Sequence, residues 1–153
     1  MIYRQAKIED SRTLAELNHQ LIRDEGHWNP MTVPELENRM RGWLADAYRA
    51  IIFQGDEDIL AYALYREDDT LIYLRQFFVI RNRRRQGIGR RAMDILRHER
   101  IGRRAMDILR HETWPRDKRL MVEVLWNNTG AIEFWKAVGF DEYSLTLEMK
   151  SGE

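Results

Sequence analysis

The sequence predicts a single α/β (α+β) domain, residues 1–153, with a mixed, mostly antiparallel central sheet flanked by helices. Two amphipathic helical segments occupy the first third of the chain, and three strand-like runs follow in series. A succession of helix, strand, helix and strand then completes the chain. No Ser/Pro-rich or Gly-rich linker divides the 153 residues, a length that suits one domain.

The first third predicts one short strand and two helices. The strand opens near Ile2, and leucines at helical spacing follow until Gly26, a residue type that often ends a helix. The second helix begins at Thr32, because Thr32 to Glu35 has the Thr-x-x-Glu form of a capping box. Apolar residues at helical spacing continue to Leu44, so both helices should bury one face.

The middle of the chain predicts an antiparallel meander. Three apolar runs, YRAIIF from Tyr48, ILAYALY from Ile59 and LIYLRQFFVI from Leu71, are separated by the polar turns QGDED and REDDT. Consecutive strands joined by such short turns pair with one another in opposite directions.

The last third predicts two further strands and a helix between them. KRLMVEVLW from Lys118 and YSLTLEM from Tyr143 both alternate in polarity, as half-buried strands do. Asn128 can cap the intervening helix, and Gly139 stands where a left-handed residue would end it.

Twelve residues, IGRRAMDILRHE, occur twice in tandem, at 88–99 and at 101–112. In one continuous helix this spacing would turn the second apolar stripe about 220° from the first, so both copies cannot dock on one sheet. We expect the two copies to compete for one position, with a ligand at the preceding loop selecting the first copy. Alternatively, an extended helix docks in a neighbouring chain and forms a swapped dimer.

Composition narrows the classes of function. The 25 Lys+Arg residues balance 25 Asp+Glu residues, which argues against general binding to nucleic acid or to acidic membranes. With no cysteine, the chain has no disulfide, thiolate nucleophile or cysteine metal site, and an intracellular compartment is expected. The charged start MIYRQAKIED does not resemble a signal sequence, and no run is long enough to span a membrane. We therefore expect a cytoplasmic protein.

A basic loop, Arg84-Arg85-Gln86-Gly87-Ile88-Gly89, lies between an apolar strand and an amphipathic helix. The start of a helix leaves backbone N–H groups without acceptors, and glycines let a phosphate approach them closely. The loop therefore favours a phosphate-containing ligand, although a solvated charge run beside a tight turn would look the same. The loop does not match a dinucleotide-binding fingerprint, because it lacks the third glycine. It is not a nucleotide-hydrolysing P-loop either, because it lacks Gly-Lys-Ser/Thr.

The stretch FFVIRNRRRQGIGRRAMDIL resembles the acyl-CoA-binding motif of the GNAT superfamily of N-acyltransferases, Arg/Gln-x-x-Gly-x-Gly/Ala, which is met by Arg84, Gly87 and Gly89. NTGAIEFWKAVGF from Asn128 is similar to a later motif of that family. The resemblance implies an N-acetyltransferase that uses acetyl-CoA as cosubstrate, needs no metal, and acts by direct attack of an amine on the thioester.

The resemblance also implies a set of site residues. The pyrophosphate of acetyl-CoA would lie on the backbone amides from Arg85 to Arg90, and the Val79 amide would stabilise the oxyanion. Asn128 and Trp135 would line the other side of the cosubstrate, although Asn128 can equally be a helix cap and Trp135 a core residue. The residues implied to bind acetyl-CoA are Phe77, Phe78, Val79, Arg84, Arg85, Gln86, Gly87, Ile88, Gly89, Arg90, Asn128 and Trp135.

The acid and the base are less clearly marked. Trp135 stands where many family members carry a tyrosine acid, and its indole N–H cannot give up a usable proton. Tyr143, or water, could replace that acid. For the base we favour Glu25 or His27 in IRDEGHWNPM, between the first two helices, where the family builds its acceptor site. Either residue could instead be a helix-end or turn residue, and Gln76 is a weaker acceptor-contact candidate.

The acceptor expected is a small-molecule or peptide amine, without nucleic-acid or membrane partners. A homodimer, including a domain-swapped one, stays open. One rival reading is an acyl-CoA-binding module with little or no turnover. A second rival treats the arginine-rich loop as a nucleic-acid contact, which zero net charge and the lack of interleaved aromatic residues disfavour.

Overall fold

The computed structural model describes residues 1–26, 28–97 and 119–150. Its contacts divide the chain into two compact units, Met1–Glu123 and Val124–Glu153, and each is described by itself. The organisation as one domain and the cytoplasmic location stay predictions. Within the described ranges, no helix combines the length and the apolar character needed to cross a membrane.

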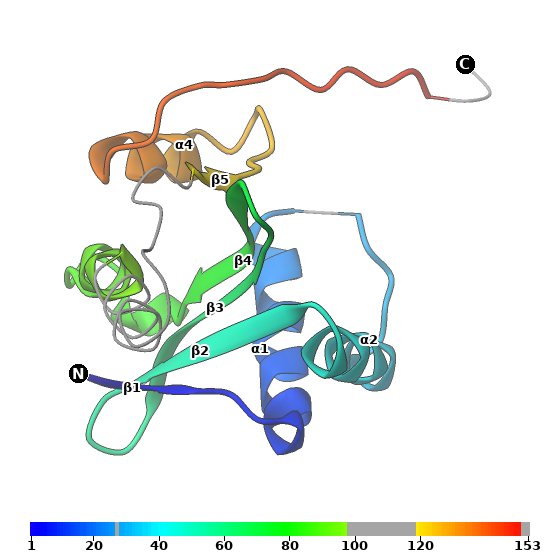
Figure 1. The fold of residues 1–153 in the computed structure, drawn as a ribbon, viewed down its shortest axis with the longest axis vertical. Coiled ribbons are helices and arrows are strands. Elements are labelled where there is room, and N and C mark those ends of the chain that lie inside the picture. The colour runs from blue at the N-terminus through cyan, green and yellow to red at the C-terminus, as the bar shows by residue number, and fades with distance from the viewer. Residues whose placement is uncertain (27, 98–118, 151–153) are drawn as a thin grey trace. The chain divides into compact units, whose positions relative to one another are not determined.

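The first unit contains a mixed, mostly antiparallel sheet flanked by helices, which confirms the predicted fold class (Figure 1). Among the described residues, five strands lie in the order β1-β2-β3-β4-β5. Neighbouring strands from β1 to β4 are antiparallel, and β5 is parallel to β4. The strands are β1 (Ile2–Gln5), β2 (Tyr48–Gln54), β3 (Ile59–Glu67), β4 (Leu71–Val79) and β5 (Arg119–Val122).

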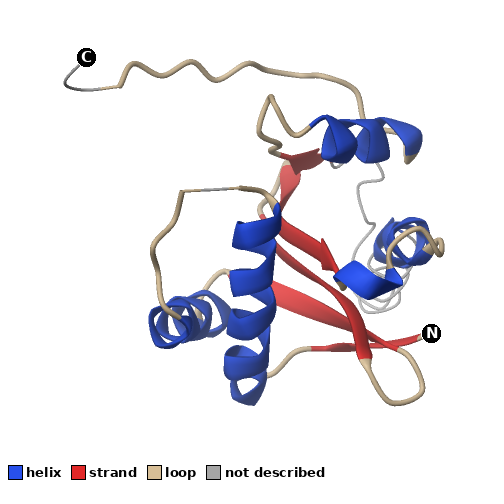
Figure 2. Cartoon of the chain, turned by 180° about the vertical axis from the view of Figure 1, so that it is seen from behind, coloured by secondary structure: helices blue, strands red, loops and turns tan. Residues whose placement is uncertain are grey.

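Two helices, α1 (Ser11–Asp24) and α2 (Val33–Ala45), cover one face of this sheet, whereas the helical segment 88–97 lies on the other face (Figure 2). The predicted capping box is present. Thr32 N donates to Glu35 Oε1 (3.3 Å), and Glu35 N donates to Thr32 Oγ1 (3.4 Å). These bonds satisfy backbone donors that the start of α2 would otherwise leave unpaired.

The core lies between the sheet and the first two helices. Its largest fully buried side chain is Tyr62 on β3, whose hydroxyl donates to Gln76 Oε1 of β4 at 2.9 Å. A buried hydroxyl is costly without such a partner, so this bond offsets the cost of burying the Tyr62 hydroxyl. The buried cluster consists of Leu14, Leu17, Leu21, Met40, Ala50, Ile52, Tyr62, Leu64 and Phe78.

Residues 88–97 of the first copy form the helical segment that follows the loop. Its first helical bond runs from Arg91 N to Gly87 O (3.0 Å). Helical spacing predicts that Ile88, Ala92, Ile95 and Leu96 form the apolar stripe of this copy. The prediction is partly correct, because Ile95 is only half-buried and Met93 is buried in addition. The buried side chains of this segment are Ile88, Ala92, Met93 and Leu96. The second copy, 101–112, lies outside the described residues, so the competition between copies and the swapped dimer stay predictions.

The second unit contains α4 (Thr129–Ala137), which follows Asn128 as predicted. The strand predicted from Tyr143 is wrong, because residues 140–150 form no strand. Leu145, Leu147 and Met149 are 75%, 83% and 95% exposed. Alternating polarity supplies one apolar face, but a strand also needs a neighbour that pairs with its backbone, and sequence alternation does not specify one.

The strand predicted from Lys118 is also shorter than expected, because β5 ends at Val122. Beyond it Val124 is half-buried, and Leu125 and Trp126 are 40% and 81% exposed. β5 pairs with only the first four residues of β4, and beyond them no ladder extends the strand.

Candidate active site

The loop that follows β4 is an exposed turn with two left-handed residues. A short 3-10 turn, Arg81–Arg83, leads into it, and the residues from 81 to 87 are exposed. Arg85 has φ 63° and Gly87 has φ 77°. Turns that contain left-handed residues can gather successive backbone N–H groups into concavities that bind anions. The predicted phosphate loop therefore has a backbone suited to an anionic ligand.

Gly87 ends this turn and begins the helical segment. Because the first helical bond is made by Arg91 N, the N–H groups of Ile88, Gly89 and Arg90 have no acceptor within the helix. The helix dipole adds positive potential at the same end. A Cβ at Gly87 would meet no atom within 4 Å, so the backbone conformation, rather than crowding, is what favours glycine here.

Arg84 ties the loop to the rest of the first unit. Its Nε donates to Val79 O at 2.9 Å, and its guanidinium donates to Asp24 Oδ2 of α1 at 2.5 Å. The same guanidinium lies 5.4 Å from the ring centroid of Phe78. Arg84 therefore holds the end of α1, the end of β4 and the turn together.

β4 is irregular in the middle. The β3–β4 register shifts so that Leu64 pairs with Gln76 and Tyr65 pairs with Leu74, which leaves Arg75 as an extra residue. The β4–β5 pairing also stops at Leu74. Beyond this point, the side of β4 that faced β5 has no strand beside it in the described residues.

The last residues of β4 turn backbone groups toward that side. Ile80 N donates to Leu60 O of β3 at 2.9 Å, and residues of an antiparallel strand alternate in the direction of their hydrogen bonds. The N–H and C=O of Val79 therefore point away from β3, in agreement with the Arg84 bond to Val79 O. Phe78 is fully buried in the core, and Phe77 is half-buried.

A group of arginines and aromatic rings lies beside the extra residue of β4. The Arg39 guanidinium of α2 and the Arg75 guanidinium lie 4.5 Å and 4.7 Å from the ring centroid of Trp43. Arg75 also donates to the Tyr48 hydroxyl at 3.3 Å, and Arg39 donates to Asn18 Oδ1 at 3.0 Å. Sequence reasoning missed this group because its members come from separate elements.

Two acidic residues border this face of the first unit. Glu123 directly follows β5, one residue beyond the last β4–β5 pair, Leu74 with Val122. Burial, and then Glu123, raise the pKa of Tyr73, to which Glu123 is hydrogen-bonded. Burial, and then Glu25, raise the pKa of Tyr62. A clue to Glu123 was available in the sequence, since it is the charged residue within an apolar, alternating run.

The predicted bases are placed only in part. Glu25 is exposed at the end of α1, and its N–H donates to Leu21 O at 3.0 Å. His27 lies outside the described residues. Asn29 accepts a bond from Met31 N at 2.9 Å, so its side chain helps to shape the turn between the first two helices.

Three predicted residues lie in the second unit. Asn128 Oδ1 accepts a bond from Ala131 N at 3.2 Å, which caps α4. Trp135 is 8% exposed, with edge-on contacts to Phe134 and Phe140 at 5.0 Å and 5.1 Å between ring centroids. Tyr143 is 71% exposed. The cap and core roles of the first two are thus visible, and their roles toward acetyl-CoA stay predictions.

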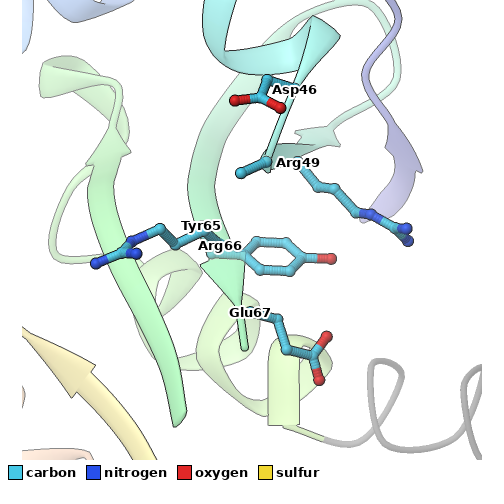
Figure 3. Close-up of a pocket in the computed structure, with 6 residues that line it drawn as sticks. Asp46, Arg49, Tyr65, Arg66 and Glu67 are labelled. Atoms are coloured by element: carbon cyan, nitrogen blue, oxygen red, sulfur yellow. The ribbon is translucent and has the colours of Figure 1, made fainter. Parts of the chain in front are cut away.

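A polar hollow of about 120 Å³ lies elsewhere on the first unit (Figure 3). Glu67 in its lining pairs with Ile72 at the start of β4, whereas the loop follows the other end of that strand. The hollow is therefore separate from the loop. It is lined by Asp46, Ala47, Arg49, Tyr65, Arg66 and Glu67. In the described part of the chain, no group of three or more His, Cys, Asp or Glu side chains is placed to hold a metal ion.

Comparisons with known proteins identify relatives of this chain. Residues 14–140 match the model of a family described as "Acetyltransferase (GNAT) family". No curated protein gives a significant match.

Several solved structures share the fold. A single-substitution mutant of the BH1408 protein from Bacillus halodurans is 20% identical with a TM-score of 0.70, over 98% of this chain and 99% of that chain. A possible acetyltransferase from Clostridium difficile 630 is 16% identical with a TM-score of 0.70, over 98% and 96%. An aminoglycoside N-acetyltransferase, AAC(6')-Iy, in complex with the bisubstrate analog CoA-S-monomethyl-acetylneamine is 15% identical with a TM-score of 0.71, over 98% and 97%.

Proposed function

Because the chain belongs to the acetyltransferase (GNAT) family, we propose that it is an N-acetyltransferase that transfers the acetyl group of acetyl-CoA to a primary amine. The observation that carries the proposal is the exposed turn at the end of β4, where left-handed residues lead into the start of a helix. Backbone N–H groups at such a position suit the pyrophosphate of coenzyme A. AAC(6')-Iy, which shares the fold, is solved with a CoA-based bisubstrate analog.

In this proposal the amides from Arg85 to Arg90 hold the pyrophosphate, and the side chain of Arg84 positions the turn. Its bonds to Val79 O and Asp24 support that positioning role, because they already engage the guanidinium. The backbone from Phe77 to Val79 faces the pantetheine on the side of β4 where the β5 pairing has ended. For Asn128 and Trp135 we propose the contacts to acetyl-CoA that the resemblance of the motif beginning at Asn128 implies.

The reaction is direct acyl transfer. The neutral amine nitrogen attacks the thioester carbonyl carbon, and the Val79 N–H stabilises the developing oxyanion. The new C–N bond forms, the C–S bond breaks, and the electron pair of that bond leaves with the thiolate of coenzyme A. The proton lost by the amine goes to a base, and the thiolate takes a proton from water or from Tyr143.

Three residues are candidates for the base. Glu25 and His27 belong to the connection between α1 and α2, and Glu123 follows β5, one residue beyond the last β4–β5 pair. The position of Glu123, exposed and next to the end of the β4–β5 pairing, supports its reaching an amine there. Glu25→Gln, His27→Gln and Glu123→Gln should each spare acetyl-CoA binding, and the variant of the true base should lose about a hundredfold in turnover.

Release of free thiol from acetyl-CoA, measured over a panel of primary amines, tests the proposal. Amine-dependent release with formation of the acetylated amine supports an N-acetyltransferase. Tight binding of acetyl-CoA without release for any amine would favour the rival reading, an acyl-CoA-binding module. Failure to bind acetyl-CoA at all would contradict both.

A further inference from the structure

Two guanidinium groups share one aromatic ring on the face of the sheet covered by α1 and α2. The Arg39 and Arg75 guanidinium carbons lie 4.5 Å and 4.7 Å from the Trp43 centroid. Arg75 is exposed and bonded to the Tyr48 hydroxyl, whereas Arg39 is half-buried behind it and bonded to Asn18. Stacking on rings and neutral hydrogen bonds fix the positions of both side chains without neutralising either charge.

Neither arginine has a carboxylate partner among the described residues. Arg39 Nε is also buried without a hydrogen-bond acceptor there. Burial, and then the nearby Arg75, lower the pKa of Arg39, as expected where two like charges lie close together. Arg41 of α2, by contrast, forms an ion pair with Glu37. Within the described ranges, the two positive charges beside Trp43 therefore form no ion pair with a carboxylate.

Other charged groups border this face. Arg66 adds a third cation, 5.3 Å from the ring centroid of Tyr73. Glu123 is hydrogen-bonded to Tyr73. Burial, and then the charge of Glu25, raise the pKa of Tyr62. The arrangement thus combines an acidic residue at the end of the β4–β5 pairing with two arginines that form no ion pair in the described part of the chain. An amine and a carboxylate on one small molecule would complement both.

We propose that Arg39 and Arg75 bind a carboxylate of the acceptor, so that the preferred acceptors are amines that also carry a carboxylate, such as amino acids. The inference rests on the proposed acetyl transfer. Arginine suits this task because its planar guanidinium matches a carboxylate with two parallel hydrogen bonds. Polycationic acceptors are disfavoured, because they would meet like charge at the same place.

The test compares acceptors that differ only in the carboxylate, an amino acid against its carboxamide. The carboxamide has the lower ammonium pKa and offers more free amine at a given pH, so preference for the acid would not reflect amine availability. We expect a higher kcat/KM for the acid. Arg75→Gln should lower kcat/KM for the acid by roughly ten- to hundredfold and leave the carboxamide nearly unchanged. Arg39→Gln should act in the same direction.

Arg41→Gln is the matched control, since Arg41 lies on α2 and is paired with Glu37. It should leave the preference for the acid intact. Acetyl transfer to acid and carboxamide with equal kcat/KM would overturn the carboxylate site while leaving the proposed function standing, and so would an equal loss for both acceptors in Arg75→Gln. If no amine is acetylated, calorimetry of amino acid and carboxamide binding to the protein tests the site instead. Binding of the amino acid that is lost in Arg75→Gln supports the carboxylate site. Equal binding of the two compounds, or binding of neither, overturns it.

Discussion

Replacement of Gly87 by alanine tests how much the left-handed backbone conformation of the loop contributes to stability and to binding. Gly87 has φ 77° and open space around the position of a Cβ, so alanine meets strain without a clash. A left-handed conformation costs an L-residue roughly 1–2 kcal/mol. Loss of glycine's freedom in the unfolded chain returns about 0.4–1 kcal/mol. We therefore expect Gly87→Ala to destabilise the protein by about 1 kcal/mol, which corresponds to roughly 2–4 °C in Tm.

Two other glycines supply controls. Gly26 has φ 62° and equally open surroundings, so Gly26→Ala should cost about the same stability. Gly42 lies within α2, also with open space, and Gly42→Ala should stabilise by about 1 kcal/mol because alanine is the better helix former. The three variants separate backbone strain from loss of glycine as such.

Coenzyme A affinity then distinguishes the loop from the controls. If Gly87→Ala relaxes the turn, the N–H groups of Ile88 and Gly89 lose their arrangement, and the Kd for acetyl-CoA should rise about tenfold, equivalent to about 1.4 kcal/mol. Gly26→Ala and Gly42→Ala should bind as the wild type does. Isothermal calorimetry and thermal unfolding on all four proteins measure both quantities. Wild-type affinity in Gly87→Ala, with an unchanged Tm, would refute the reasoning.

Three further variants test other contacts. Arg84→Met removes the bonds to Val79 O and Asp24, so it should lower stability by about 1 kcal/mol and weaken acetyl-CoA binding; an unchanged Kd in calorimetry would count against the positioning role. Asn128→Ala should destabilise α4 by about 1 kcal/mol in chemical denaturation, whereas Asn128→Ser should retain the cap; equal losses in both would argue against capping. Arg4 bonds hold the pKa of Asp10 below its usual value, so Asp10 stabilises the fold above about pH 4 and loses that contribution as pH falls through its lower folded pKa. Asp10→Asn should therefore be less stable than wild type at pH 7, with a difference that shrinks in acid unfolding below about pH 4; a pH-independent difference would contradict this linkage.

Local patterns were sufficient for much of the fold. The capping box from Thr32 to Glu35 involves residues three apart, so the sequence contains all the information that the helix start requires. The meander strands alternate or run apolar between polar turns, and the structure pairs them in that order. The loop before Ile88 could also be predicted from the sequence, because a strand, glycines and a helix follow one another directly.

Features that depend on partners far away in the sequence could not be predicted from it. The extra residue at Arg75 arises from how β3 pairs with β4, and the β4–β5 pairing ends at the residue before it, Leu74. The arginines of the loop look equivalent in sequence, yet Arg84 alone bonds Asp24, sixty residues away. The strand predicted from Tyr143 failed for a related reason, since alternation describes a strand's faces but does not supply a neighbour.

Backbone amide NMR during a titration with coenzyme A tests most directly whether the turn after β4 binds the pyrophosphate. We predict that the amide resonances from Arg85 to Arg90 move the most, and that pantetheine, which lacks the diphosphate, leaves them in place. Binding of coenzyme A that perturbs other amides while those of Ile88, Gly89 and Arg90 stay unchanged would contradict the account.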